Sequence, residues 1–246
     1  MKAAPEAQRR LLELQAIDTG LQQLAHRRKN LPETADADRL AAEVGALDDE
    51  RITAQVAVDD LDRDISRIER DVEQVRSRSE KDAARLTAGS GPARELEALQ
   101  HELASLRRRQ SELEDAELEV MERREAAQAA LDAVAERIGA AREKLAEVEA
   151  AREAALGGIA KDEDWKASSR KPLAADLPAD LVALYDRIRE SSGGIGAALL
   201  RGGRCGGCRI ELAGSERGRV KAAPADEVIR CEECGRIMVR TEESGL

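Results

Sequence analysis

A long apolar repeat constrains the fold of this 246-residue chain more than any other feature of its sequence. Between residues 40 and 75, apolar side chains recur at alternating steps of four and three, and Arg51 is the one polar member of the series. This spacing places a single apolar stripe along a helix, and five heptads in one frame predict a coiled coil. The series is Leu40, Val44, Leu47, Arg51, Ala54, Val58, Leu61, Ile65, Ile68, Val72 and Val75.

The repeat stops once and then returns, which predicts that the helix folds back on itself. The break lies in the stretch LTAGSGPARELEAL, where Gly89 and Gly91 suit a tight turn and Pro92 suits the first turn of a new helix. We therefore expect an antiparallel hairpin with its tip near residues 87–92. The second series, which falters at Glu117, is Leu96, Leu99, Leu103, Leu106, Gln110, Leu113, Leu131, Val134, Ile138, Ala141, Leu145 and Val148.

Shorter signals divide the rest of the chain into predicted segments. A first helix with an apolar stripe ends before Pro32, so a turn is expected near residues 31–35, and Gly157 with Gly158 is expected to end the hairpin. The predicted domains are therefore 1–158, the hairpin with its N-terminal helix; 159–175, an irregular linker; and 176–246, a short helix followed by strands. The stripe of the first helix is Leu14, Ile17, Leu21 and Leu24, and that of the short helix is Leu181, Leu184, Tyr185 and Ile188.

All four cysteines lie in the last segment, as two CxxC pairs separated by 22 residues: Cys205, Cys208, Cys231 and Cys234. Two residues between ligands let one turn direct both sulfurs at a single ion, and four thiolates satisfy tetrahedral zinc. Glycines at 206, 207 and 235 suit the turns that such knuckles require. We predict one structural Zn²⁺ and a mainly α fold, a long antiparallel coiled-coil hairpin with a small C-terminal β zinc ribbon.

Other uses of the cysteines fit the sequence less well. A redox dithiol needs a single CxxC at a helix N-terminus, and two disulfides need an oxidising compartment, for which no export signal is visible. A catalytic zinc ion keeps one position open, whereas this site offers four thiols, and the two histidines, His26 and His101, lie in the predicted helices. Because no nucleotide-binding loop or nucleophile motif occurs either, we expect no enzymatic activity.

The distribution of charge bears on the choice of partner. Residues 1–200 carry 42 acidic and 31 basic side chains, whereas residues 201–246 carry 8 and 9. An acidic helical part disfavours nucleic acid and favours a basic protein surface. The ribbon keeps a nucleic-acid alternative open through Arg217, Arg219 and Lys221, although it has no aromatic residue for base stacking. Other arginines flank the cysteines and are expected to offset the negative charge of a zinc–thiolate centre: Arg204, Arg209, Arg230 and Arg236.

Location and assembly follow from simpler observations. No apolar stretch is long enough to cross a membrane and no signal peptide is evident, so a cytoplasmic protein without a membrane partner is expected. Trp165, the one tryptophan, is a candidate docking residue in a polar segment. The sequence leaves open whether the chain forms a homodimer.

The order of these features resembles one family. The hairpin, the stretch RELEALQHELASL after its turn, the helix LPADLVALYDRIR, CGGC and DEVIRCEECGRIMV together resemble the bacterial C4-type zinc-ribbon coiled-coil proteins. By that resemblance the four cysteines are zinc ligands, no catalysis is implied, and the chain is an adaptor or chaperone for protein partners. In this family a flagellar member binds the nitrogen-type sigma factor and a flagellin messenger RNA, and a chlamydial member binds that sigma factor and type III secretion components. The resemblance thus implies an interaction protein, with nucleic-acid binding as the alternative.

Overall fold

Three long helices make up most of the computed structural model, which describes residues 1–89 and 91–246. Its contacts divide the chain into two units, residues 35–149 (the hairpin unit) and residues 1–34 together with 150–246 (the base unit). The helices are α1 (Pro5–Lys29), α2 (Pro32–Ala88), α3 (Ala93–Ala175), α4 (Ala179–Ser191) and α5 (Gly214–Ala222), followed by a short 3-10 helix, η1 (Glu242–Ser244).

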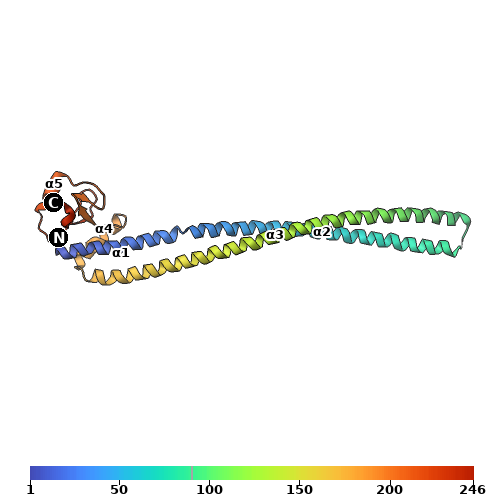
Figure 1. Cartoon of the computed structure of the whole chain (residues 1–246), viewed down its shortest axis with the longest axis horizontal. Coiled ribbons are helices and arrows are strands. Elements are labelled where there is room, and N and C mark those ends of the chain that lie inside the picture. Colours follow the sequence, from blue (N-terminus) through green and yellow to red (C-terminus); the bar gives the residue numbers. More distant parts are fainter. Residues whose placement is uncertain (90) are drawn as a thin grey trace. The chain divides into compact units, whose positions relative to one another are not determined.

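The hairpin unit consists of α2 and the first two thirds of α3, which run side by side in opposite directions (Figure 1). Ion pairs between the arms fix this direction, because the partner on α3 moves back along the chain as the residue on α2 moves forward. The predicted antiparallel coiled-coil hairpin is confirmed. The interarm pairs are Asp48–Arg142 at 2.9 Å, Glu50–Arg137 at 2.8 Å, Asp62–Arg124 at 2.9 Å and Arg78–Glu102 at 2.7 Å.

The two arms join where the sequence predicted the tip. α2 ends at Ala88 and α3 begins at Ala93, and Gly89 and Gly91 adopt φ values of +62° and +149°, which glycine tolerates far better than other residues. Residue 90, which falls within the predicted tip at 87–92, lies outside the described residues.

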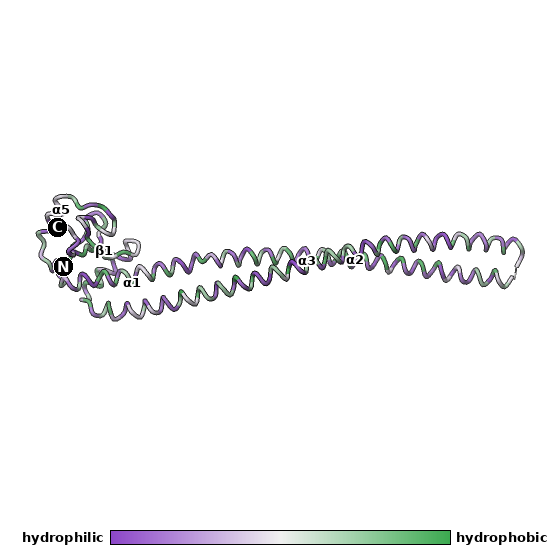
Figure 2. The backbone as a smooth tube through the Cα atoms, viewed as in Figure 1, coloured by the Kyte–Doolittle hydropathy of each residue, from purple (hydrophilic) through white to green (hydrophobic). Residues whose placement is uncertain are grey.

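The seam between the arms is packed unevenly. Leu47 is buried against Val134, Ile138 and Ala141, and other apolar side chains are buried nearer the tip. Residues 48–57 on α2 and 114–133 on α3, in contrast, contain no fully buried side chain among those described. Figure 2 shows apolar and polar residues alternating along both arms, as the heptad repeat requires. The middle of the hairpin therefore buries less apolar surface between its two arms than the parts on either side.

The base unit packs helices against a small sheet. The strand order is β2-β1-β4-β3; β1 pairs with β4 in parallel and with β2 antiparallel, and β3 pairs antiparallel with β4. The strands are β1 (Ala197–Arg201), β2 (Arg204–Cys205), β3 (Ile229–Arg230) and β4 (Ile237–Val239), within the segment 176–246 where strands were expected after a short helix. α4 likewise lies where a short helix was predicted, and it buries Leu181, Tyr185 and Ile188.

The N-terminal residues are part of this base unit. The backbone N–H of Ala3 donates to the carbonyl of Asp226 at 2.8 Å, and the N–H of Val228 donates to the carbonyl of Met1 at 3.1 Å. Leu11 and Leu14 of α1 then join the core formed by α4, β1 and β4. The two chain ends are thus tied into one unit.

Two of the predicted boundaries are wrong. The segment 159–175 is not an irregular linker, because α3 passes through Gly157 and Gly158 and continues to Ala175. The predicted domain 1–158 is also divided differently, since residues 1–34 group with 150–246. The reason is a polar continuation of the heptad repeat. Ile159 is buried, and at steps of four, three and four the half-buried Glu163, Lys166 and Arg170 follow it.

These polar residues pair α3 with α1 inside the base unit. Glu163 forms an ion pair with Arg28, Arg170 binds Asp18, and Lys166 lies against Gly20, where a Cβ atom would come within 2.8 Å of its side chain. Gly157 and Gly158 are exposed within α3, and each lowers helix stability by about 1 kcal/mol relative to alanine. The contacts with α1 offset this cost. Only the apolar half of this interface was visible as a sequence pattern.

Candidate metal centre

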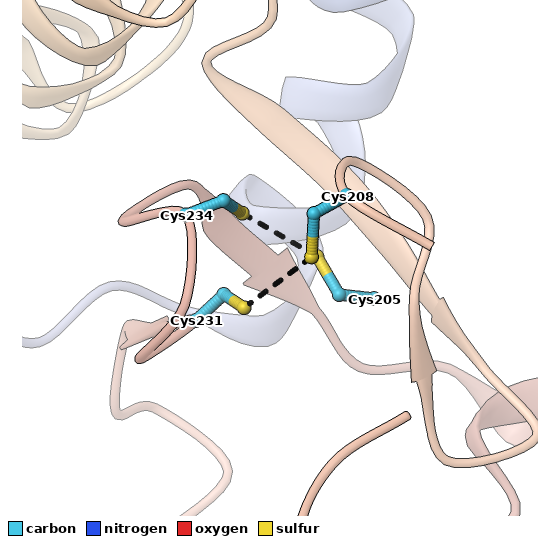
Figure 3. Close-up of side chains that lie close together, drawn as sticks. All are labelled: Cys205, Cys208, Cys231 and Cys234. Carbon is cyan, nitrogen blue, oxygen red and sulfur yellow. Dashed lines mark hydrogen bonds between the residues drawn. The ribbon is translucent and has the colours of Figure 1, made fainter. Parts of the chain in front are cut away.

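The four cysteines converge from two loops of the base unit. Cys205 ends β2 and Cys208 follows it in the next turn, whereas Cys231 follows β3 and Cys234 precedes β4. Their sulfur atoms all lie within 4.8 Å of one another, with Sγ–Sγ distances of 3.8 Å between Cys205 and Cys234 and 3.9 Å between Cys208 and Cys231 (Figure 3). Cys205 and Cys231 are buried and the other two are half-buried. The site is therefore one cluster with a partly exposed side.

The two loops have the same backbone geometry. In the first, the N–H of Arg209 donates to the carbonyl of Cys205 at 2.7 Å; in the second, the N–H of Gly235 donates to the carbonyl of Cys231 at 2.9 Å. Arg209 and Gly235 both adopt a left-handed conformation, with φ of 63° and 69°. Each CxxC thus forms a knuckle closed by a backbone hydrogen bond between residues four apart. The left-handed conformation strains Arg209 in the first knuckle, whereas Gly235 adopts it without strain in the second.

A second hydrogen bond repeats in each knuckle. The N–H of Cys205 donates to the carbonyl of Ile210 at 3.0 Å, and the N–H of Cys231 donates to the carbonyl of Arg236 at 2.9 Å. The glycine at 206 is required by close approach, since a Cβ atom there would lie 2.7 Å from the carbonyl oxygen of Leu199 on β1. The cysteines are therefore held by backbone bonds rather than by their own side chains.

The electrostatics of the thiols explain why a cation suits this cluster. Burial raises the pKa of the Cys205 thiol and raises that of Cys231 to about 12. Burial also acts against ionisation of Cys234, but hydrogen bonds from the N–H of Arg236 and from the neighbouring thiols lower its pKa. Four thiolates so close together need a positive ion to remain deprotonated. A donor set of four sulfurs at tetrahedral spacing fits Zn²⁺.

The arginines beside the cysteines hold the knuckles in place. Arg236 donates to the carbonyls of Ser192 at 2.6 Å and Ile195 at 3.1 Å, which joins the second knuckle to the end of α4. Arg230 donates to the carbonyl of Gly235 at 2.8 Å, within the same knuckle, and Arg204 forms an ion pair with Glu211. These side chains carry positive charge near the sulfurs and also close the loops, a second use that spacing alone did not indicate.

The residues predicted as nucleic-acid contacts mostly have partners inside the ribbon. Arg217 donates to the carbonyl of Gly245, and Arg219 forms an ion pair with Glu232 at 2.9 Å. Lys221 is exposed at the C-terminal end of α5. The structure therefore places all three on one short helix, and two of them bind the ribbon itself.

A buried polar cluster was missed by the sequence reasoning. Asp18 of α1 is only 2% exposed and accepts hydrogen bonds from the Tyr185 hydroxyl at 2.8 Å and from Arg170 Nε at 2.7 Å, and Arg189 lies 3.5 Å away. Burial and the bond to Asp18 raise the pKa of Tyr185, and the same carboxylate raises the pKa of Arg170. Because its carboxylate is fully engaged, Asp18 joins α1, α3 and α4 rather than offering a reactive group. The signal was its place four residues after Leu14, on the buried side of α1.

The remaining candidate residues lie away from the cysteines. His26 and His101 are exposed on α1 and α3. Trp165 is 67% exposed on α3, with Lys166 Nζ 5.6 Å from its ring centre. Among the helices described, none has a stretch apolar enough to span a lipid bilayer.

Comparison with known proteins matches both parts of this description. A family model described as a CT398-like coiled coil hairpin domain matches residues 14–193, and one described as a C4-type zinc ribbon domain matches residues 204–238. The uncharacterized protein Rv2229c of Mycobacterium tuberculosis is 44% identical over 98% of each chain, and the uncharacterized protein ML1638 of Mycobacterium leprae is 30% identical over 91% of this chain and 96% of that protein.

Solved structures show the same fold. A protein from Mycobacterium smegmatis is 39% identical and covers 98% of this chain and all of its own, with a TM-score of 0.87. CT398 from Chlamydia trachomatis covers 95% of this chain and 97% of its own at a TM-score of 0.66, but it is only 18% identical, so this likeness concerns the fold alone.

Proposed function

The chain belongs to the family of CT398-like coiled coil hairpin proteins that carry a C4-type zinc ribbon, and on that premise we propose that it is a non-enzymatic adaptor for other proteins. One observation carries the proposal: the hairpin unit exposes most of its side chains, and residues 35–149 contain 30 acidic and 18 basic residues in all. A long acidic surface of this kind suits a basic protein partner. The proposal places the protein in the cytoplasm, where its thiols stay reduced.

In this proposal the cysteine cluster has a structural role. Cys205, Cys208, Cys231 and Cys234 would hold one Zn²⁺, which supplies the positive charge that keeps four thiolates together. The two knuckles then fix β1 and β4 against α1 and α4, so the metal maintains the surface of the base unit. Elemental analysis of the purified chain should find about one zinc per molecule if all four thiols bind one ion.

The adaptor proposal is tested by capturing partners from the native host. The full chain serves as bait, with and without nuclease, beside a variant that lacks residues 51–64 and 123–136. These two segments face each other around the Asp62–Arg124 pair, so removing two heptads from each arm keeps the repeat in frame. We expect reproducible protein partners with the full hairpin, retained after nuclease treatment and lost with the shortened one. Capture of no protein by the intact chain would refute the proposal.

Nucleic-acid binding is the competing function, and the same experiment addresses it. Arg217 and Arg219 are already bound within the ribbon, which leaves fewer free cations for phosphates. RNA or DNA binding through the ribbon would show a steep salt dependence and would weaken when Arg217, Arg219 and Lys221 become alanine. Binding with both properties, and partners lost on nuclease treatment, would favour this alternative over the adaptor.

A further inference from the structure

The middle of the hairpin contains an apolar groove that the coiled coil does not fill. Its volume is about 510 Å³, far above the ~30 Å³ share of one water molecule. Both walls belong to the hairpin unit. The lining residues are Glu50, Thr53, Ala54, Ala57, Ala130, Ala133, Val134 and Arg137.

The groove arises where the heptad repeat places alanine instead of charge. Glu50 and Arg137 face each other across the arms and form an ion pair at 2.8 Å. One heptad further, the corresponding residues are Ala57 and Ala130, which are both exposed and too short to meet. The small side chain of Ala54 lies at the adjacent seam position, so the arms leave a hollow there instead of a bridge.

A large apolar side chain is exposed beside this groove on the surface of α2. Val56 is 51% exposed and follows Thr53 of the groove wall by three residues, which places the two on neighbouring parts of the helix surface. Val56 lies in the stretch 48–57, where no described side chain is fully buried. On α3 the opposite rim carries further exposed alanines at 126 and 129. The apolar surface here is therefore exposed to solvent. The short alanine side chains of α3 let another helix approach its backbone closely.

The charge around the groove identifies the chemistry of its occupant. Residues 48–64 and 122–138 together carry 11 acidic and 5 basic side chains. A second copy of this hairpin would bring two acidic surfaces together, which is unfavourable. A basic helix with large aliphatic side chains would instead place them in the hollow and its cations against the acidic rims.

We propose that this groove is the docking site for a basic amphipathic helix of a partner protein, which completes a local three-helix bundle with α2 and α3. The inference rests on the proposed adaptor function and specifies which surface the partner uses. An aliphatic side chain between Ala57 and Ala130 would act as a knob in a preformed hole, and Val56 would extend the apolar contact on the side of α2.

The test uses the full chain and a synthetic helical peptide with leucine at alternating third and fourth positions and with lysine and arginine along both flanks. A matched peptide has glutamate in place of every cation. Fluorescence anisotropy should show binding of the basic peptide and not of the acidic one. Ala130→Lys, which fills the groove and adds positive charge, should weaken binding at least about tenfold. Ala130→Leu, which only fills it, should also weaken binding.

Ala135→Lys is the matched control, because Ala135 is exposed on the same helix and five residues away, on the opposite edge of the seam. It should change affinity by less than about twofold. Equal weakening by Ala130→Lys and Ala135→Lys would mean general attraction to an acidic rod and would overturn the proposal, as would absence of peptide binding. A dimer of the unmodified chain that Ala130→Lys dissociates in sedimentation would assign the groove to a second copy instead. Since Ala57 is also exposed, Ala57→Lys provides an independent block if Ala130→Lys lowers helicity.

Failure of this inference is distinguishable from failure of the adaptor proposal. If Ala130→Lys captures the same host proteins as the unmodified chain, the groove is not the docking site although the adaptor function stands. If the unmodified chain captures no protein, the adaptor function fails, and the peptide experiment still decides whether the groove binds a helix.

Discussion

The hairpin unit and the base unit bury apolar surface in different ways, although the chain has few aromatic residues. The hairpin repeats a two-helix seam in which each heptad buries a few aliphatic side chains and leaves the rest exposed. The base unit brings together pieces that are far apart in sequence, and it buries Tyr185, a charged Asp18 and two cysteines beside its aliphatic core. One region thus has local and redundant contacts, and the other has long-range and unique contacts.

The two units are therefore sensitive to substitution in different ways. In a repeated seam, the loss of one contact is confined to the neighbouring turns, because each heptad depends mainly on the next. In the base unit, α1, α4 and the sheet all meet at shared residues, so the removal of one group exposes several others. Substitutions of similar chemistry should therefore have larger and wider effects in the base unit than in the hairpin.

The largest difference is expected for the metal ligands. Cys231→Ser should abolish metal binding and unfold the ribbon, because a structural zinc site contributes apparent binding energy of ~10 kcal/mol or more to folding. Hydrogen exchange should then accelerate in α1 and α4, which pack on β1 and β4, and remain slow in α2. Circular dichroism should retain most of the helical signal. Loss of protection throughout α2 would contradict the division into two units.

A buried carboxylate provides the next comparison. Asp18→Ala removes the acceptor of Tyr185 and Arg170 and should lower the free energy of unfolding of the base unit by about 3 kcal/mol, since it leaves buried polar groups unpaired. The control is Asp48→Ala, which breaks an interarm ion pair of the hairpin at a more exposed position. Its expected cost is below about 1 kcal/mol. Denaturant melts read by hydrogen exchange measure both, and equal costs would remove the distinction.

An apolar substitution tests the hairpin from within. Leu47→Ala removes a side chain buried against Val134, Ile138 and Ala141 and should cost about 2 kcal/mol, at the lower end of the range for buried leucine because the seam is narrow. Ile52→Ala, five residues away and exposed, should change stability by less than about 0.5 kcal/mol. Exchange rates of the amides around residue 47 report the difference. An equal cost for Leu47→Ala and Ile52→Ala would mean that the exposed face of α2 is also packed, which would remove the contrast.

The smallest effect is expected for one hydrogen bond of the base unit, and its size should depend on pH. Tyr185→Phe removes one hydrogen bond to Asp18 and should destabilise the base unit by about 1–2 kcal/mol at neutral pH. Burial raises the pKa of Tyr185 above the ordinary value near 10, so the stabilisation is complete below that pH and declines as the pH rises further. Melts of both proteins at increasing pH should show the difference in their free energies of unfolding decreasing above about pH 10. A difference that stays constant would mean that ionisation of the Tyr185 hydroxyl does not affect folding.

Periodic and spaced features were predictable from the sequence. The hairpin, the end of the first helix before Pro32 and the turn at Gly89 and Gly91 were all predicted, because apolar repeats and glycine or proline act locally. The convergence of the two CxxC pairs followed from their spacing. Their backbone geometry did not, since the left-handed conformation at Arg209 is imposed by closure of the knuckle on β1.

Contacts made by charged residues were the part that sequence reasoning missed. The heptad spacing continues through Glu163, Lys166 and Arg170. Charged residues at such positions are expected to be exposed, and their partners on α1 are 130 or more residues away in the sequence. Asp18 was overlooked for the same reason, since its partners Arg170, Tyr185 and Arg189 lie on two other helices, α3 and α4. Apolar patterns reveal that a face is buried, whereas the burial of a charge depends on partners that only the folded chain brings near.

The tie between the first residues and residues 226–228 also sets an order of events during synthesis. At about 5–20 residues per second, the ribosome needs ~10–40 s to pass from the end of α1 to the segment that pairs with Met1 and Ala3. Both arms of the hairpin are complete long before then, and their local contacts allow early folding. α1 therefore emerges well before its last partners in the sheet, and until then its apolar face is covered only in part, by α3 and α4.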